Sequence, residues 1–150
     1  MELSRLAMGG RAWTTNEAQM ASWQPTRGLL VLRITGKGLE DFALPMHEEL
    51  EAALAKCDSL HVYVDVERLD RYDSKLRVRA TESFAAHRPR IASMHVLFRS
   101  SFVAMGVAVA NLALGNLITS HSKRSTFKRA LDAHLSSLNL VGFSSEVLTT

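Results

Sequence analysis

The feature that most constrains the fold of this chain is a repeated switch between two periods of hydrophobicity. Short runs with strand character alternate with longer segments in which apolar residues recur every three or four positions. The clearest strand covers residues 60–66, where valines alternate with His61, Tyr63 and Asp65, so the two sets point to opposite faces. Such alternation predicts an α/β domain built on a mostly parallel sheet with right-handed crossovers.

We predict nine elements in the order β-β-α-β-α-β-α-β-α. Their approximate positions are residues 18–23, 29–35, 42–57, 60–66, 74–88, 92–98, 102–114, 117–119 and 125–138. The turn chemistry of residues 24–28 makes the first two strands an opening β-hairpin. We expect one domain at residues 18–138, preceded by an arm (1–17) and followed by a tail (139–150) that frays.

Polar residues at the helix starts predict how the helices are capped. We expect Asp41 to cap the first helix, Asp73 or Ser74 the second, and Ser100 or Ser101 the third. Pro45 falls in the first turn of its helix, where a missing N–H costs no intrahelical hydrogen bond.

Composition excludes several classes of protein. With 150 residues, 47% hydrophobic and 22% charged, the chain is neither disordered, collagen-like nor a disulfide-built miniprotein. A net charge of +3 is too small to indicate nucleic-acid binding. The single Cys57 can form no internal disulfide and no secretory leader opens the chain, so we expect a cytoplasmic protein.

Three patches of sequence carry a resemblance to a known family. They are the strand and glycine at residues 29–37, the valine-rich strand with its loop at 64–74, and the helical run at 127–131. Together with the element order, they make residues 18–138 resemble the STAS family (sulphate transporter and anti-sigma-factor antagonist), especially its bacterial SpoIIAA-like branch. The resemblance implies a non-enzymatic regulatory role in cytoplasmic signalling, with a protein partner switched by binding or phosphorylation.

The same resemblance points to Ser74 as a phosphorylation site. In anti-sigma antagonists, a serine at the start of the second helix is phosphorylated within a pattern like Asp-Ser-Ser-Gly-Leu. This chain has Asp73-Ser74-Lys75-Leu76, which keeps the Asp-Ser pair but lacks the glycine and one small residue. A phosphate there would meet a helix N-terminus, which favours negative charge. The alternative is that the Asp-Ser pair is an ordinary helix cap.

Residues 102–114 form an uncharged segment that is apolar on nearly every helical face. It is shorter than the roughly 20 residues that a membrane-spanning helix needs, so no transmembrane segment is expected. A helix of this kind must be covered. A second copy of the chain, a protein partner or a lipid-like ligand would cover it, and the alternative is that the N-terminal arm and the last helix do so.

The loop after the valine-rich strand carries four carboxylates. They are Asp65, Glu67, Asp70 and Asp73, at the carboxyl end of a parallel strand, where α/β folds place ligands. Their oxygens are of the kind that binds magnesium, but the interleaved Arg68 and Arg71 would neutralise the carboxylates. We expect a solvated, salt-bridged loop, with no metal and no cofactor.

No catalytic residues are predicted, because neither a phosphate-binding loop nor a nucleophile elbow is present. The six histidines form no metal motif; His61 and His95, on neighbouring strands, are expected to cover the less buried sheet face. Cys57 is expected in the core. A basic cluster at the start of the last helix is expected to be solvated; it consists of Lys123, Arg124, Lys128 and Arg129.

The function indicated is therefore a protein–protein interaction module, which also fits a homodimer. Its predicted partner-binding residues are Asp65, Asp70, Asp73, Phe102, Met105 and Val109, with Ser74 as the switch. One alternative is an immunity protein dedicated to one toxin. Another is a small-molecule or lipid carrier, since STAS-like folds are similar to CRAL-TRIO domains. A cavity of roughly 300 Å³ or more near Met94 would favour the carrier.

Overall fold

The computed structural model describes residues 1–137 together with Phe143 and Val147. Its strands are β1 (Glu2–Arg5), β2 (Arg11–Thr14), β3 (Ala18–Thr26), β4 (Leu29–Gly38), β5 (Leu60–Asp65), β6 (Leu69–Tyr72), β7 (Ile91–Leu97) and β8 (Ile118–His121). Its helices are α1 (Ala43–Leu54), α2 (Ser74–Ala86), α3 (Ser101–Ala113) and α4 (Arg124–Ser136). Three short 3-10 turns complete the described elements, namely η1 (Ala7–Gly9), η2 (Glu40–Phe42) and η3 (Arg88–Arg90).

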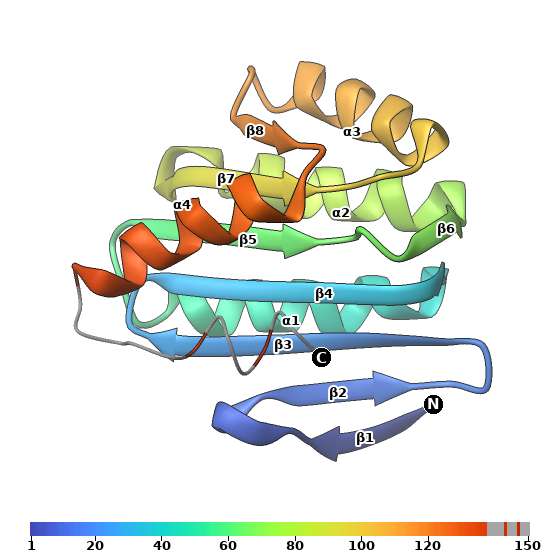
Figure 1. The fold of residues 1–150 in the computed structure, drawn as a ribbon, viewed down its shortest axis with the longest axis horizontal. Coiled ribbons are helices and arrows are strands. Elements are labelled where there is room, and N and C mark those ends of the chain that lie inside the picture. The colour runs from blue at the N-terminus through green and yellow to red at the C-terminus, as the bar shows by residue number, and fades with distance from the viewer. Residues whose placement is uncertain (138–142, 144–146, 148–150) are drawn as a thin grey trace.

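One mixed sheet organises the molecule. Its strands follow the order β1-β2-β3-β4-β5-β7-β8, and β6 pairs with the far end of β4. The strands from β1 to β4 are antiparallel neighbours, whereas β4, β5, β7 and β8 are parallel. Helices α1 and α2 lie behind the sheet and α4 crosses in front of it (Figure 1). The predicted α/β class, with a single largely parallel sheet, is confirmed.

The opening hairpin is also confirmed, as β3 and β4. Its turn contains Gly28 at φ +86°, a conformation that L-residues with a side chain rarely adopt. Both strands are longer than predicted, because β4 continues to Gly38 and finds partners on both sides along its length.

The predicted order misses three strands. Two of them, β1 and β2, lie in the N-terminal arm and extend the sheet beyond β3. The third, β6, lies in the connection after β5, where we expected only a loop. It forms because β5 pairs with β4 only from Leu29 to Arg33, and β6 then pairs with β4 from Gly36 to Gly38. Backbone groups of β4 that β5 leaves free are satisfied in this way.

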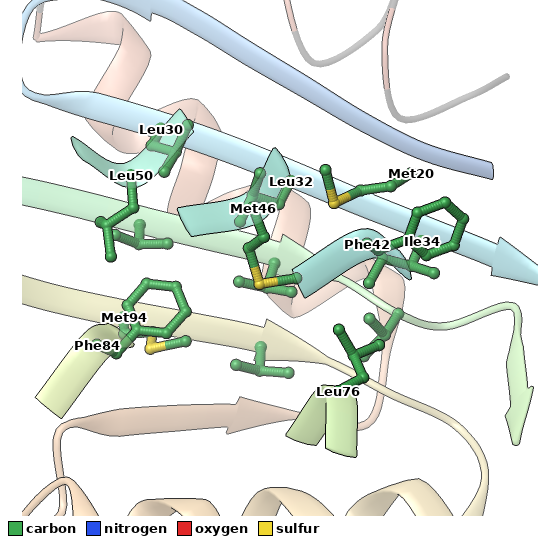
Figure 2. Close-up of a cluster of buried hydrophobic side chains, with 14 of the residues drawn as sticks. Met20, Leu30, Leu32, Ile34, Phe42, Met46, Leu50, Leu76, Phe84 and Met94 are labelled. Atoms are coloured by element: carbon green, nitrogen blue, oxygen red, sulfur yellow. The ribbon is translucent and has the colours of Figure 1, made fainter. Parts of the chain in front are cut away.

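Two apolar cores lie on the two faces of the sheet. The larger one packs residues from β4, β5 and β7 against α1, α2 and α3, and Figure 2 shows its centre around Leu32, Met46 and Met94. The smaller one packs Val31 and Tyr63 against α4. The predicted alternation along β5 is therefore confirmed, with its valines on one side and Tyr63 on the other. Cys57 packs partly buried against the larger core, just beyond the end of α1.

The helix starts differ from the expected caps in two of three cases. Ser100 caps α3 as predicted, its hydroxyl accepting the Val103 N–H at 3.4 Å. Asp41 caps neither η2 nor α1, and the side chain of Asp73 makes no hydrogen bond to the N–H groups of α2, which only its backbone carbonyl accepts. The Asp73 carboxylate instead accepts the N–H of Glu40 at 2.8 Å, so it caps η2 from a distant part of the chain.

The first helix is also shorter than the predicted 42–57, since η2 takes up its beginning. The tail predicted to fray lies outside the described residues except for two side chains. These are Phe143 and Val147, both buried in the smaller core.

Candidate interaction site

The outer face of α3 carries an exposed apolar stripe. Its four residues are Phe102, Met105, Val109 and Leu112, with exposed fractions of 52%, 69%, 51% and 79%. Their spacing of three, four and three residues puts them on one side of the helix, while Val103 and Gly106 face inward and are buried. This is the spacing by which one helix packs along another.

The N-terminal arm and the last helix do not cover this stripe, so the alternative that they do is wrong. The arm extends the opposite end of the sheet beyond β3, and α4 lies on the opposite face (Figure 1). Within the part of the chain that the structure describes, the α3 stripe therefore faces solvent. Exposed apolar patches of this kind mark sites of interaction.

The start of α2 lies beside the stripe. The rings of Tyr72 and Phe102 are 5.0 Å apart between centroids. The Tyr72 hydroxyl also lies against Gly106, so closely that a Cβ at that position would overlap with it. Because Ser74 follows Tyr72 by two residues, the predicted phosphorylation site and the apolar stripe occupy one region of the surface. Ser74 itself is exposed.

Asp70 and Asp73 belong to this same region, at either end of β6 and its link to α2. Asp70 is exposed, whereas Asp73 is half-buried and bonded to other residues of the chain. The hydrogen bond from the Glu40 N–H lowers the pKa of Asp73, and Lys37, with its Nζ 3.4 Å from Asp73 Oδ1, lowers the pKa further. The carboxylate therefore stays ionised at neutral pH and connects the start of α2 to η2.

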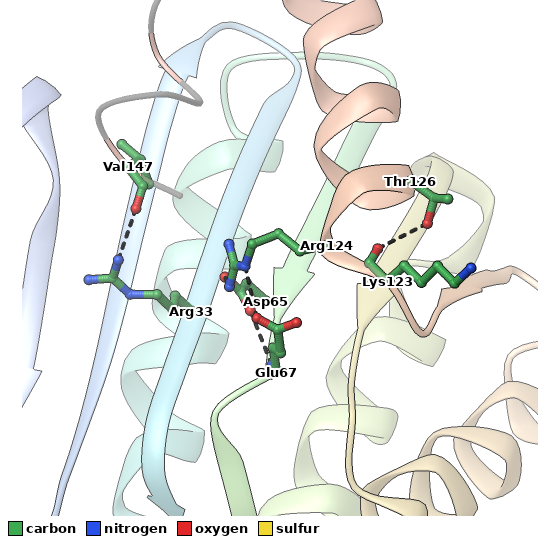
Figure 3. A network of polar contacts seen from close by, with 7 residues as sticks. All are labelled: Arg33, Asp65, Glu67, Lys123, Arg124, Thr126 and Val147. Carbon is green, nitrogen blue, oxygen red and sulfur yellow. Dashed lines mark hydrogen bonds and ion pairs between the residues drawn. The ribbon is translucent and has the colours of Figure 1, made fainter. Parts of the chain in front are cut away.

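Asp65 lies elsewhere and is almost completely buried. Arg124, at the start of α4, binds two carboxylates. Its Nη2 donates to Asp65 Oδ2 at 2.9 Å, and its Nε donates to Glu67 Oε1 at 2.8 Å (Figure 3). Asp65 thus attaches α4 to the sheet and offers no accessible surface. Sequence reasoning missed this partner because Arg124 lies 59 residues after Asp65, inside a cluster expected to be solvated.

The histidines on this face of the sheet are half-buried. His61 and His95 do lie on neighbouring strands, as predicted, but α4 crosses the face on which they lie. His121 and His134 join them there, which sequence reasoning did not foresee. The sequence signal that could have revealed this grouping is the alternation in residues 61–65 and 93–97. It puts the odd-numbered side chains of both strands, His61 and His95 among them, on one face of the sheet.

A small cavity lies between the sheet and the helices behind it. It has a volume of about 130 Å³ and an almost entirely apolar lining that includes Met94, Met46 and the inner side of α3. Phe102 and Met105 do not line it, since they face outward on α3. The volume is well below the roughly 300 Å³ of a typical drug-sized ligand site.

The described residues hold neither a metal-binding cluster nor a membrane-spanning helix. No group of three or more histidine, cysteine, aspartate or glutamate side chains is placed to hold a metal ion among residues 1–137, Phe143 and Val147. Across that same part of the chain, no helix has the length and apolar character needed to cross a bilayer.

Comparison of the fold identifies its structural relatives. A SpoIIAA-like protein of the DUF3478 family from Shewanella loihica PV-4 is 17% identical, with a TM-score of 0.60 over 81% of this chain and 98% of that one. The anti-sigma factor antagonist SpoIIAA, in its unphosphorylated form, is 16% identical, with a TM-score of 0.52 over 75% and 96%. An anti-sigma factor antagonist from Mycobacterium paratuberculosis is 12% identical, with a TM-score of 0.50 over 86% and 99%.

The chain therefore has the SpoIIAA-like fold, and the resemblance to STAS domains is confirmed at the level of the fold. By sequence, it matches no protein-family model and no curated protein. Two of the three structural relatives are regulators that antagonise anti-sigma factors.

Proposed function

We propose that this chain is a non-enzymatic interaction module with a regulatory or adaptor role in bacterial cytoplasmic signalling. Its partner is a protein that packs a helix along the stripe of Phe102, Met105, Val109 and Leu112. The observation that carries the proposal is this exposed, uncharged stripe on α3. The anti-sigma factor antagonists of similar fold support the class of function.

Spacing and chemistry both favour a helix as the bound element. Side chains spaced three and four residues apart interlock with those of a second helix laid along the first. The 13 residues of α3 carry no charge, so the partner helix is expected to be apolar on its contact face. Asp70 and Ser74, at the margin of the stripe, would supply the polar rim that such interfaces have.

The test compares two substitutions of exposed apolar residues. Tagged wild-type protein is purified from its native cells, the protein that copurifies is identified, and its affinity is measured against Met105→Asp and Leu44→Asp. We expect Met105→Asp to weaken binding by about 30-fold or more, since a charge would enter the apolar contact. Leu44, on α1, is similarly exposed at 63% and serves as the matched control. Equal affinity for both variants would refute the α3 interface.

A homodimer is the second way to cover the stripe. Sedimentation of the purified wild-type protein and the Met105→Asp variant distinguishes the two arrangements. A dimer that the substitution converts to a monomer would make a second copy of the chain the partner. If the wild-type protein is a monomer, the partner that covers the stripe is a different protein. That partner would be a toxin if the chain is an immunity protein.

Ser74 is proposed as the switch of this interaction. A phosphate there would add nearly two negative charges at the start of α2, beside the apolar stripe. Partner binding is measured for the wild type, Ser74→Ala and Ser74→Glu. We expect Ser74→Glu to alter binding and Ser74→Ala to resist regulation. Unchanged binding of Ser74→Ala under conditions of high and low phosphorylation would remove the switch while leaving the α3 interface intact.

The second candidate function, a ligand carrier, is supported by the apolar cavity beneath α3. At about 130 Å³, the cavity matches a ligand about as large as one aromatic ring and is too small for a lipid chain without movement of α3. Thermal unfolding with added small aromatic compounds tests this function. A saturable rise in melting temperature that Ala110→Leu abolishes, since Ala110 lines the cavity, would support a carrier.

A further inference from the structure

Four histidines from four different elements gather where α4 crosses the sheet. They are His61 of β5, His95 of β7, His121 of β8 and His134 of α4. His95 Nδ1 lies 2.9 Å from His121 Nε2, and the rings of His61 and His134 are 4.6 Å apart between centroids. The Tyr63 ring stacks on His95 at 4.7 Å and donates its hydroxyl to the Ala130 carbonyl of α4.

The hydrogen bonds of His95 and His121 indicate which of their ring nitrogens carry protons. The Thr126 hydroxyl donates its only hydrogen to the Lys123 carbonyl, as Figure 3 shows, so it must accept from His121 Nδ1 at 3.0 Å. Neutral His121 then has a bare Nε2, which accepts the Nδ1–H of His95. A continuous chain of hydrogen bonds thus connects β7 and β8 to the first turn of α4.

This series of hydrogen bonds persists when the His95–His121 pair takes up one additional proton but not when it takes up two. With one proton on the His95–His121 pair, one nitrogen still accepts and the contact persists. With both rings protonated, two N–H groups and two positive charges would face each other. The other pair behaves similarly, because protonation of both His61 and His134 would place two cations in ring contact.

Burial and the neighbouring histidines favour the neutral rings. Burial lowers the pKa of all four histidines, and repulsion from neighbouring histidines lowers it further in His95 and His134. The other ionisable groups on the elements packed here are Tyr63 and Asp65 of β5, Arg33 and Lys37 of β4, and Arg124, Lys128, Arg129 and Asp132 of α4. Asp65 is bound to Arg124 and Arg33 to the Val147 carbonyl.

We propose that the four histidines form a pH-sensitive latch, which holds α4 on the sheet at neutral pH and releases it on acidification. The direction follows from linkage, because a detached helix lets the rings regain their ordinary affinity for protons. Acid therefore favours the detached state, beginning as the pH falls through about 6.5. Release would expose the buried apolar face of α4 at Phe127, Leu131 and Leu135.

Hydrogen exchange at residue resolution tests the latch. Protection of backbone amides in α4 is compared between about pH 7.5 and about pH 5.5, after correction for intrinsic exchange rates, with α1 as the internal reference. We expect protection in α4 to fall by about tenfold or more while α1 stays protected. The variant His95→Asn/His121→Asn, which removes two of the four titrating rings, should reduce this pH dependence. His47→Gln, a histidine on α1, is the matched control and should retain it.

Three outcomes would overturn the latch: equal α4 protection at both pH values, parallel loss in α1 and α4, or an unchanged response in His95→Asn/His121→Asn. If that double variant does not fold, His134→Gln and histidine titration of the wild type replace it. The latch then requires His134→Gln to reduce the response, and the four clustered rings to titrate below about 6.5, the ordinary pKa of histidine. The α3 interface is on the opposite face, so Met105→Asp should leave all these results unchanged.

Discussion

At the scale of single residues, the contact that most shapes the molecule is the one between Arg124 and the two carboxylates Asp65 and Glu67. Asp65 is 2% exposed and would be costly to bury as an unpaired charge. Arg124 contacts both carboxylates through different nitrogens, which fixes the start of α4 over the end of β5. In sequence, the acidic loop resembles a ligand site. In the structure, its first carboxylate, Asp65, instead forms a buried ion pair that attaches α4 to the sheet.

Removing the arginine should therefore cost far more than removing a neighbouring cation. We expect Arg124→Met to lower the free energy of unfolding by about 3 kcal/mol, because the buried Asp65 carboxylate would lose its counter-charge. Urea denaturation measures the change. Lys123→Met, an exposed cation one residue earlier, should change stability by less than about 0.5 kcal/mol. In Asp65→Asn/Arg124→Met, much of the loss should be recovered, and an equally unstable double variant would contradict the pairing.

At the scale of elements, α3 is held to the start of α2 by a close fit between one glycine and one tyrosine. Tyr72 packs its ring against Phe102 and its hydroxyl against the backbone of Gly106. The same tyrosine precedes Asp73, which caps η2 and so sets the position of α1. Three helices are thus connected through a few residues of β6 and the link that follows it.

Gly106→Ala tests this fit. A methyl group there would overlap with the Tyr72 hydroxyl, so we expect a loss of about 1–3 kcal/mol in unfolding free energy despite the better helix propensity of alanine. In a Tyr72→Phe background the overlapping oxygen is absent, although Cζ still lies 2.8 Å from the added atom. The loss should then be smaller, as measured by thermal or urea unfolding against Tyr72→Phe alone. A stabilised Gly106→Ala protein would show that α3 has room to move.

The elements that the sequence predicts well are those in which the spacing of apolar residues matches the buried face of the strand or helix. The alternation along β5 and the helical face of α1 follow directly from which side chains the core must hold. Strand β6 shows little alternation of apolar and polar residues, because only Leu69 of its four residues is buried. The strand forms because its backbone pairs with β4. The α3 stripe was evident as an uncharged segment, but whether other parts of the chain cover it depends on topology. The histidine cluster and Arg124 depend on long-range register, which no local pattern contains.

At the scale of the whole molecule, the sheet separates two regions with different roles. The face with α1, α2 and α3 holds the larger core, the cavity and the exposed stripe, and the face with α4 holds the smaller core and the histidines. The N-terminal arm belongs to both, since Trp13 of β2 packs against the larger core and Ala12 of β2 lies in the smaller one. We propose residues 18–138 as the unit that can fold without this arm.

Deleting residues 1–17 tests that proposal and leaves Trp23 as the only tryptophan, since the chain has two. Trp23 donates its indole N–H to the Ala7 carbonyl at 3.1 Å and packs closely against Gly10. Its fluorescence emission should therefore shift to longer wavelength relative to full-length Trp13→Phe, while circular dichroism retains the α/β signature. Loss of that signature would make the arm an integral part of the domain.

The lengths of the two outer strands have a further consequence. A sheet edge is a row of unpaired backbone groups that another chain can extend, and long, flat edges lead to aggregation. In the sheet as described, both outer strands, β1 and β8, are only four residues long, although β4 in the interior has ten. So short an edge gives an incoming strand little to pair with. The architecture therefore limits uncontrolled polymerisation through its backbone and leaves recognition to side chains on its helices, where it can be selective.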